Sequence, residues 1–403
     1  MPSGSSLIIR QLIIQAIYWL IQFAIYRILR SQFGDTAFRR TIIIAAMIAV
    51  NLPWLYVSVR MMIYHQPPHS YTLLVTIFGW FMLSLIYLLY FGIIRSGYAL
   101  WEVAKPVSLS SAAGATAALT RRAFLQKATI GFGAVALITS ARGLWLARGT
   151  PRLERITLHL PDLPVAFDGV RIVQLSDFHS GPYMSRDQML SVRRLVEELK
   201  PDLYVLTGDF VDAFPEQVPP FVEAFENLRA PLGVFSVLGN HDYFADIETV
   251  EAGLIAAGLP FLRNTSHVLE YHGDQLAIVG VDDLWASRRN GRGPNIAAAI
   301  KDLPENMFKI CLSHQPGYWP EIKKHNIALT LCGHTHGGQF GIVGTQISLA
   351  RIAGPYVAGL YTEDGPGRAG MQLYVNRGLG VFGLPLRIGM PPEITEVTLK
   401  RRG

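Results

Sequence analysis

The stretch at residues 333–339 reads Gly-His-Thr-His-Gly-Gly-Gln and directly follows the apolar run 327–332. Its two histidines are one residue apart and lie between glycines, which allow a turn to approach neighbouring groups closely. A buried strand that ends in such a turn can aim both imidazoles at one point. The spacing therefore favours a metal site, although the motif alone also fits ordinary loop histidines.

Four apolar runs upstream end in polar residues of the same kind, at 176–179, 207–212, 239–242 and 313–316. Ligands bind outside the carboxyl ends of the strands in open α/β sheets, so we expect these segments to meet. The candidate metal ligands are Asp177, His179, Asp209, Asn240, His314, His334 and His336.

The size of this ligand set indicates two metal ions rather than one. A single ion in a mixed nitrogen and oxygen site takes about four to six ligands. Seven ligands, one of them a central carboxylate that can bridge, suit two ions about 3.5–4 Å apart. Imidazole and carboxylate together favour Mn, Zn or Fe over Mg or Ca, and the lack of a nearby thiolate disfavours structural zinc.

Charge divides the 403-residue chain into two unlike parts. Residues 1–150 carry 13 Lys and Arg against 2 Asp and Glu, whereas residues 151–403 carry 23 against 28. The pI of about 9.3 therefore comes from the N-terminal part. A mildly acidic C-terminal part argues against a nucleic-acid partner held on a basic face. Cys311 and Cys332 lie in apolar runs and indicate no disulfide framework.

Three apolar runs in the N-terminal part predict an α-helical transmembrane region. Residues 7–27, 41–59 and 71–94 are each close to the roughly 20 residues that a helix needs to cross a bilayer. Basic residues concentrate between the first two runs and after the third, which places those loops in the cytoplasm. We therefore expect three transmembrane helices within residues 1–105 and an extracytoplasmic N-terminus.

The segment 106–150 is expected to connect the two parts. A Pro-, Ser-, Ala- and Gly-rich linker is followed by paired arginines at 121–122 and by the uncharged run 128–141. This order is similar to a twin-arginine export signal with cleavage near Ala141, and it fits a fourth membrane span equally well. Both interpretations place the C-terminal part on the extracytoplasmic side of the cell membrane.

From residue 153 onwards, short apolar runs alternate with amphipathic segments. Helices are predicted over 185–199 and 221–228. Strands are predicted at 156–160, 170–175, 203–206, 234–238, 276–281, 308–312, 328–332, 373–375 and 394–399. Alternating strands and helices with additional strands near the C-terminus predict a layered α/β sandwich for residues 151–403.

The five polar segments resemble the motif series of the calcineurin-like metallophosphoesterase superfamily. In order they read D-x-H, G-D-x-x-D, G-N-H-D, a single H and G-H-x-H. Together with 376–380, 385–387 and 391–393, the form of the 333–339 stretch is similar to a bacterial branch of membrane-linked, twin-arginine-exported phosphoesterases. The multispan N-terminus is similar to that of animal transmembrane proteins with a metallophosphoesterase domain. The resemblance covers about 153–400 and implies an α/β/β/α metallophosphoesterase sandwich preceded by the transmembrane region.

The resemblance also implies a role for each motif residue. One ion would be held by Asp177, His179, Asp209 and His336, and the second by Asp209, Asn240, His314 and His334. His241 would contact the substrate phosphate and protonate or stabilise the leaving oxygen, with Asp242 orienting it.

Sequence position suggests roles for three further charged residues. Asp212, three residues after a predicted ligand, is expected to support its turn or to contact a ligand. Arg377 and Arg387 lie in a Gly-rich segment and are expected to bind the substrate phosphate, although surface arginines fit this pattern as well.

These expectations describe a membrane-anchored enzyme that hydrolyses a phosphodiester or pyrophosphate bond. Two divalent ions would activate a water molecule and neutralise charge on the phosphoryl oxygens, so no protein nucleophile is required. The expected partners are a phosphoester at the cell envelope, for which a lipid-linked compound is a candidate, the membrane and the twin-arginine machinery. One alternative is a non-catalytic binding or scaffold module of the same fold. Another is a membrane sensor or transporter subunit, although the spans offer few ionisable residues for an ion path.

Overall fold

We describe the protein from a computed structural model. Its described residues are 4–33, 36–64, 138–291, 293–365 and 368–402, with isolated positions between 84 and 135. The chain divides into two units, Met1–Leu144 and Trp145–Gly403.

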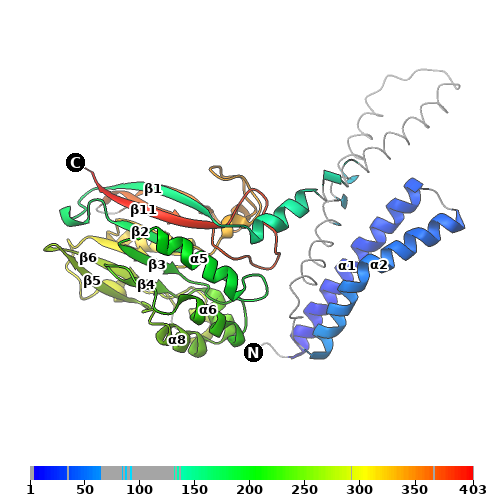
Figure 1. The fold of residues 1–403 in the computed structure, drawn as a ribbon, viewed down its shortest axis with the longest axis horizontal. Coiled ribbons are helices and arrows are strands. Elements are labelled where there is room, and N and C mark those ends of the chain that lie inside the picture. The colour runs from blue at the N-terminus through cyan, green and yellow to red at the C-terminus, as the bar shows by residue number, and fades with distance from the viewer. Residues whose placement is uncertain are drawn as a thin grey trace, which may run out of the picture. The chain divides into compact units, whose positions relative to one another are not determined.

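Two long helices form most of the described part of the N-terminal unit. They are α1 (Gly4–Phe33) and α2 (Ala37–Tyr64), drawn in blue in Figure 1. The two helices contact each other through Tyr18 and Trp54, whose stacked rings have centroids 3.9 Å apart. The predicted runs 7–27 and 41–59 fall inside these helices, so their helical structure is confirmed.

None of the helices among the described residues combines the length and the apolar character needed to span a membrane. The transmembrane character predicted for 7–27 and 41–59 is therefore not supported. Polar side chains interrupt both runs. Gln22 and Asn51 are buried, and the Asn51 side-chain amide donates a hydrogen bond to Gln22 Oε1 over 3.4 Å. The run at 71–94, the linker and the paired arginines lie largely or wholly outside the described residues.

The C-terminal unit is built from two β-sheets and the helices that cover them. Its strands are β1 (Arg152–Leu160), β2 (Arg171–Leu175), β3 (Leu203–Thr207), β4 (Val234–Val237), β5 (Thr265–Tyr271), β6 (Asp274–Gly280), β7 (Lys309–Leu312), β8 (Leu329–Cys332), β9 (Gly359–Gly365), β10 (Arg368–Val375) and β11 (Glu393–Arg401). Its α-helices are α5 (Arg186–Glu198), α6 (Val218–Phe225), α7 (Asn240–Ala245), α8 (Ile247–Ala256), α9 (Ala286–Asn290), α10 (Ile296–Ile300) and α11 (Trp319–Ile322). Short 3-10 helices are η1 (Val165–Phe167), η2 (Pro215–Gln217), η3 (Pro316–Tyr318), η4 (Lys323–His325), η5 (His336–Gly338) and η6 (Leu349–Ile352).

The strand order explains why the polar loops meet. The first sheet has the order β1-β11-β2-β3-β4 and the second has the order β5-β6-β7-β8-β10-β9. Strands β2, β3 and β4 are parallel, as are β6, β7, β8 and β10. Parallel neighbours end at the same edge of a sheet, so the loops after β2, β3 and β4 lie together, and so do those after β7 and β8.

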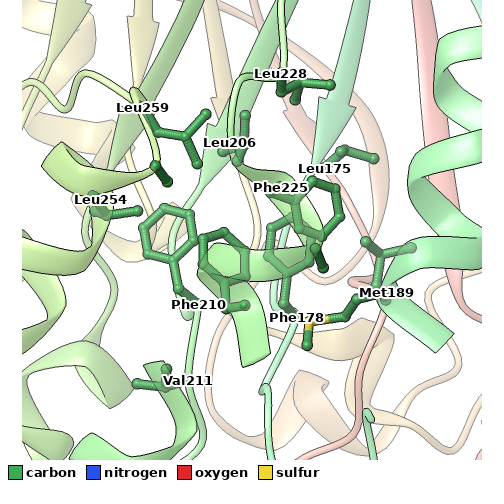
Figure 2. Close-up of a cluster of buried hydrophobic side chains, with 14 of the residues drawn as sticks. Leu175, Phe178, Met189, Leu206, Phe210, Val211, Phe225, Leu228, Leu254 and Leu259 are labelled. Carbon is green, nitrogen blue, oxygen red and sulfur yellow. The ribbon is translucent and has the colours of Figure 1, made fainter. Parts of the chain in front are cut away.

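Three apolar clusters separate the layers of this unit. On the outer face of the first sheet, α5, α6 and α8 pack against a cluster that is rich in aromatic rings (Figure 2). There the ring of Phe178 meets Phe221 and Phe225 edge-on, at centroid distances of 5.1 and 5.0 Å. A second cluster lies between the two sheets, and a third packs α10 and α11 on the outer face of the second sheet. The chain therefore forms the layered α/β sandwich predicted from the sequence.

Helix α5 shows how the sequence positions a covering layer. Ser185 caps its N-terminus in a capping box with Gln188, which satisfies backbone amides that have no partner inside the helix. Met189, Val192 and Val196 are buried at intervals of three and four residues, as an amphipathic helix requires. The helix predicted at 185–199 is therefore confirmed.

Candidate metal centre

The loops that follow the parallel strands turn sharply at the predicted ligands. Five of the seven ligands have positive φ: Asp177 (53°), His179 (48°), Asp209 (54°), His334 (74°) and His336 (51°). Residues other than glycine adopt such angles rarely, at a cost of about 1 kcal/mol or more each. This concentration of strained backbone, in loops that follow strands of both sheets, is typical of a functional site.

The motif glycines are required by close approach between these loops. A Cβ atom on Gly333 would lie 1.9 Å from Ser176 Oγ and 2.3 Å from Asp177 Oδ2. A Cβ atom on Gly239 would lie 2.2 Å from Asp209 Oδ1. Any side chain at either position would therefore push a predicted carboxylate ligand out of place.

All seven predicted ligands come together where the ends of these strands from both sheets meet, in two groups that Asp209 connects. Ligand atoms of Asp177, His179 and His336 lie within 4.8 Å of one another, as do those of Asp209, His314 and His334. Asp209 Oδ2 is 3.1 Å from His314 Nε2 and 3.5 Å from His179 Nε2, so it faces both groups. The seventh residue, Asn240, places Oδ1 3.2 Å from His314 Nε2.

The protonation states suit a cation. Burial, together with the neighbouring charge of His314, lowers the pKa of His334 to about 3. Burial and the charge of His179 hold the pKa of His336 well below its usual value. Burial opposes ionisation of Asp209, but the charges of His314 and His241 hold its pKa well below the usual range. Near neutral pH, His334, His336 and Asp209 therefore offer two neutral imidazoles and a carboxylate. Burial opposes protonation of His314, but the charge of Asp209 holds the pKa of His314 well above its usual value. An ion that binds there would displace this proton, because imidazole binds metals in its neutral form.

Tautomer and spacing also fit a pair of divalent ions. His314 Nδ1 lies 2.7 Å from the carbonyl oxygen of Thr207 and donates a hydrogen bond to it, so Nε2 is the ring nitrogen that faces Asp209. The Nε2 atoms of His179 and His336 face each other at 2.9 Å, and His334 Nδ1 faces His314 Nε2 at 3.2 Å. Ring nitrogens that converge in this way around buried carboxylates match a metal-binding donor set.

His241 lies beside this centre, and its partner differs from the one expected. Its Nδ1 atom contacts the main-chain oxygen of Asp212 and lies 3.8 Å from the carboxylate of the same residue. The Asp212 carboxylate also lies 3.4 Å from His179 Nδ1. Asp212 therefore contacts both a predicted ligand and the predicted acid, which agrees with its expected supporting position.

Asp242 was expected to orient His241, but its carboxylate binds the backbone instead. It accepts hydrogen bonds from the amides of Gly239 (2.8 Å), Phe210 (2.9 Å) and Asp209 (3.1 Å). Burial and the neighbouring charge of Asp209 raise the pKa of Asp242 to about 7. The reason for the difference is local geometry: Asp242 is the third residue of α7, so its side chain points back towards the residue before the helix.

The two arginines expected to bind substrate phosphate are buried, and both bind other groups of the protein. Arg377 forms ion pairs with Glu154 (2.7 Å) and Glu393 (3.0 Å). Arg387 donates to the carbonyl oxygens of Arg377 (2.9 Å) and Met390 (3.1 Å), and its Nη2 lies 3.2 Å from His336 Nδ1. This geometry does not support the predicted phosphate contacts, because neither guanidinium group is exposed.

Sequence reasoning missed the aromatic residues beside His241. The rings of Phe244 and Phe382 lie 4.8 and 5.0 Å from its imidazole, measured between centroids. Phe244 follows the G-N-H-D segment by two residues, and this position was the only available signal. Phe382 comes from a Gly-rich loop whose path the sequence does not indicate.

Known proteins resemble this chain in the same region. The family model of the calcineurin-like phosphoesterases (Metallophos) matches residues 170–338. The uncharacterized metallophosphoesterase YkuE of Bacillus subtilis is 33% identical over 291 residues, which cover 70% of this chain and 98% of that protein. An uncharacterized metallophosphoesterase of Aquifex aeolicus is 33% identical over 253 residues, covering 62% and 93%. The transmembrane protein with metallophosphoesterase domain of Danio rerio is 31% identical over 276 residues, covering 66% of this chain and 61% of the relative.

The chain therefore belongs to the calcineurin-like phosphoesterase family, as the motif series predicted. Its donor set suits a centre of two metal ions, and it is a metal-dependent hydrolase of phosphoric esters.

Proposed function

We propose that this chain hydrolyses a phosphodiester or pyrophosphate bond at a centre of two divalent ions, Mn, Zn or Fe. The observation that carries the proposal is the position of Asp209, which faces ligand atoms of both groups. When bound, the two ions supply Lewis acidity, lowering the pKa of a water molecule and offsetting charge on the phosphoryl oxygens.

The side chains have separate tasks in this proposal. Asp177, His179 and His336 would hold one ion, Asn240, His314 and His334 would hold the other, and Asp209 would contribute to both sites. His241, next to this centre, donates a proton or a hydrogen bond to the leaving oxygen. Asp212 fixes the His241 ring, because Nδ1 contacts its main-chain oxygen.

The experiment measures metal content and turnover of bis(4-nitrophenyl) phosphate with Mn²⁺, Zn²⁺ or Fe²⁺. The wild-type chain is expected to bind two ions and turn over, whereas Asp209→Asn is expected to lose both ions and at least 10³-fold in rate. Asp187→Asn, on the exposed face of α5, serves as the matched control. Two fully loaded ions without turnover would favour the scaffold alternative, and full loading in Asp209→Asn would contradict its bridging role.

We further propose that the N-terminal unit holds the enzyme at the cell membrane, with the catalytic unit on the extracytoplasmic side and a substrate in the envelope. The support is the apolar runs and the distribution of arginines in the sequence. The chain also resembles the exported, membrane-linked branch of the family, with a twin-arginine-like pair at 121–122.

Fusions of alkaline phosphatase and of green fluorescent protein after Arg148 test this topology. Fluorescence without phosphatase activity would overturn it.

A further inference from the structure

Two partly exposed aromatic rings flank the imidazole of His241. Phe382 is 55% exposed and meets His241 edge-on, with an interplanar angle of 75° and a centroid distance of 5.0 Å. Phe244 is 38% exposed and lies 4.8 Å from the same imidazole. Phe382 is also 6.4 Å from the ring of His179, a predicted metal ligand. A group bonded to an oxygen that leaves beside His241 would therefore contact these rings.

The exposed position of Phe382 is fixed by hydrogen bonds. The side chain of Gln339, the last residue of the 333–339 stretch, accepts from the amide of Phe382 over 2.9 Å. It also donates to the carbonyl oxygens of Phe382 (3.0 Å) and Leu384 (3.1 Å). The loop that carries the ring is thus tied to the same motif that supplies His334 and His336.

Phe244 is supported from behind in a similar way. The ring of Trp285 meets it edge-on at 4.9 Å, with an interplanar angle of 83°. Such edge-to-face pairs are favourable and hold both rings in place. Two rings that are fixed and still exposed provide apolar surface that a bound apolar group would remove from water.

The surroundings of His241 distinguish between two leaving groups. A pyrophosphate bond releases a second phosphate, which needs cationic partners. Among the described residues, the aromatic rings in contact with His241 belong to His179, Phe244 and Phe382. The nearby Arg377 pairs with Glu154 and Glu393, and Arg387 donates to a backbone carbonyl oxygen. This environment suits an apolar alcohol or phenol better than a phosphate.

We propose that the substrate is a phosphodiester with an apolar leaving group, aryl or alkyl; this inference rests on the proposed function. Phe382 and Phe244 are the specificity-determining residues, and Gln339 is a positioning residue that acts through Phe382. The oxygen of one water molecule forms a bond to phosphorus, and the bond from phosphorus to the leaving oxygen breaks with its electron pair on that oxygen. The leaving oxygen takes a proton from His241. The proton that the attacking water gives up passes to solvent, and solvent returns a proton to His241. The products are a phosphomonoester and a neutral alcohol or phenol.

The test compares methyl phenyl phosphate with methyl 4-butylphenyl phosphate, using the full chain in detergent and loaded with Mn²⁺. The two phenols have nearly equal acidity, so the ratio of their kcat/KM values reports contact with the butyl group. We expect wild type to favour the butylphenyl ester by at least tenfold, and Phe382→Ala or Phe244→Ala to reduce this ratio below threefold. Ile255→Ala is the control, because this apolar residue of α8 is 69% exposed and should keep the tenfold ratio.

Each outcome bears on the inference separately from the proposed function. Hydrolysis of both esters with a wild-type ratio near one would overturn the apolar subsite and leave the proposed function standing. An unchanged ratio in both alanine variants, with metal content intact, would also overturn it. A higher kcat/KM on inorganic pyrophosphate than on either ester would overturn it in favour of the other bond type. Failure of the fully loaded wild type on all three compounds would overturn the proposed function and this inference together.

Discussion

Two aspartates near His241 have different partners, although the sequence makes them look alike. The Asp242 carboxylate is fully buried and accepts from four backbone amides, which join the ends of β3 and β4. Asp212 is partly exposed and contacts the rings of His179 and His241. Asp242 is therefore a structural residue of the two loops, whereas Asp212 acts on the imidazoles.

Replacing each aspartate by asparagine should separate these roles. Asp242→Asn faces an amide NH₂ towards amide donors, so we expect a loss of about 2–4 kcal/mol in the free energy of unfolding, since an unsatisfied buried group costs about 1–3 kcal/mol. Asp212→Asn should cost less than about 1 kcal/mol but lower kcat or metal affinity about 10–100-fold, as expected for a group that orients a ligand. Urea denaturation and steady-state kinetics on the same preparations provide the comparison. The reverse pattern would contradict the assignment.

The buried carboxyl group of Asp283 should make the stability of the metal-free protein depend on pH. Its carboxylate accepts from Gln315 Nε2 (2.9 Å) and from the Trp285 amide (2.7 Å), and burial raises its pKa from 3.8 to about 6. The folded state therefore binds more protons than the unfolded state between these values. The resulting stabilisation is complete below about pH 4 and is lost as the pH rises through 6, by about 3 kcal/mol at most.

The measurement is urea denaturation of chelator-treated wild type and Asp283→Asn at pH 4, 5, 6 and 7. The variant has no carboxyl group to titrate at this position, so wild type should lose stability relative to it across this range. Parallel stability curves for the two proteins would show that Asp283 does not titrate as stated.

The central strands could be predicted from the sequence because both of their faces are buried. The apolar runs 203–206 of β3 and 310–312 of β7 are continuous for this reason, and every residue in each strand is buried. The edge strands β5 and β9 were missed. Most of their residues are at least partly exposed, and β9 begins and ends with glycine, so neither shows a clear apolar run.

The convergence of the candidate ligands was predictable for a related reason, since these residues directly follow buried strands whose ends the sequence marks. The paths of the longer loops were not. Arg387 is buried, and its guanidinium group donates to backbone carbonyl oxygens of its own loop and of Arg377. Nothing in the local sequence indicates this burial. The same limit applies to Phe382, whose position depends on hydrogen bonds to Gln339, 43 residues earlier.

The loop around Phe382 should loosen when Gln339 is shortened. Gln339 has a φ of 59°, so asparagine is a suitable replacement because it tolerates this backbone region but cannot reach the loop. We expect Gln339→Asn to lose about 1–3 kcal/mol of stability from its three hydrogen bonds. Amide hydrogen exchange at Phe382 should accelerate at least tenfold, whereas Gln346→Asn, at an exposed position, should leave it unchanged. Unaltered exchange in Gln339→Asn would show that the loop is held in another way.

In the C-terminal unit as a whole, the candidate metal centre lies where the two sheets meet. Asp177, His179, Asp209 and Asn240 follow strands of the first sheet, whereas His314, His334 and His336 follow strands of the second. The backbone already joins them there, because the His334 amide donates to Asp177 over 2.9 Å. Each proposed ion takes ligands from both sheets, so metal binding should stabilise the packing of one sheet on the other.

Metal removal should therefore lower the thermal stability of the whole unit, not only its activity. A ligand present at 100 times its Kd stabilises the folded state by about 2.7 kcal/mol per site, or about 5 kcal/mol for two ions. In a unit of this size, each kcal/mol corresponds to about 2–4 °C, so EDTA should lower the Tm of wild type by about 10–20 °C. Asp209→Asn should show only a few degrees of difference between Mn²⁺ and EDTA, because the shared ligand is lost. Asp187→Asn, whose side chain is 88% exposed, should keep the full difference. Calorimetry with parallel metal analysis decides the question: equal Tm values for fully loaded and metal-free wild type would mean that the ions do not join the two sheets.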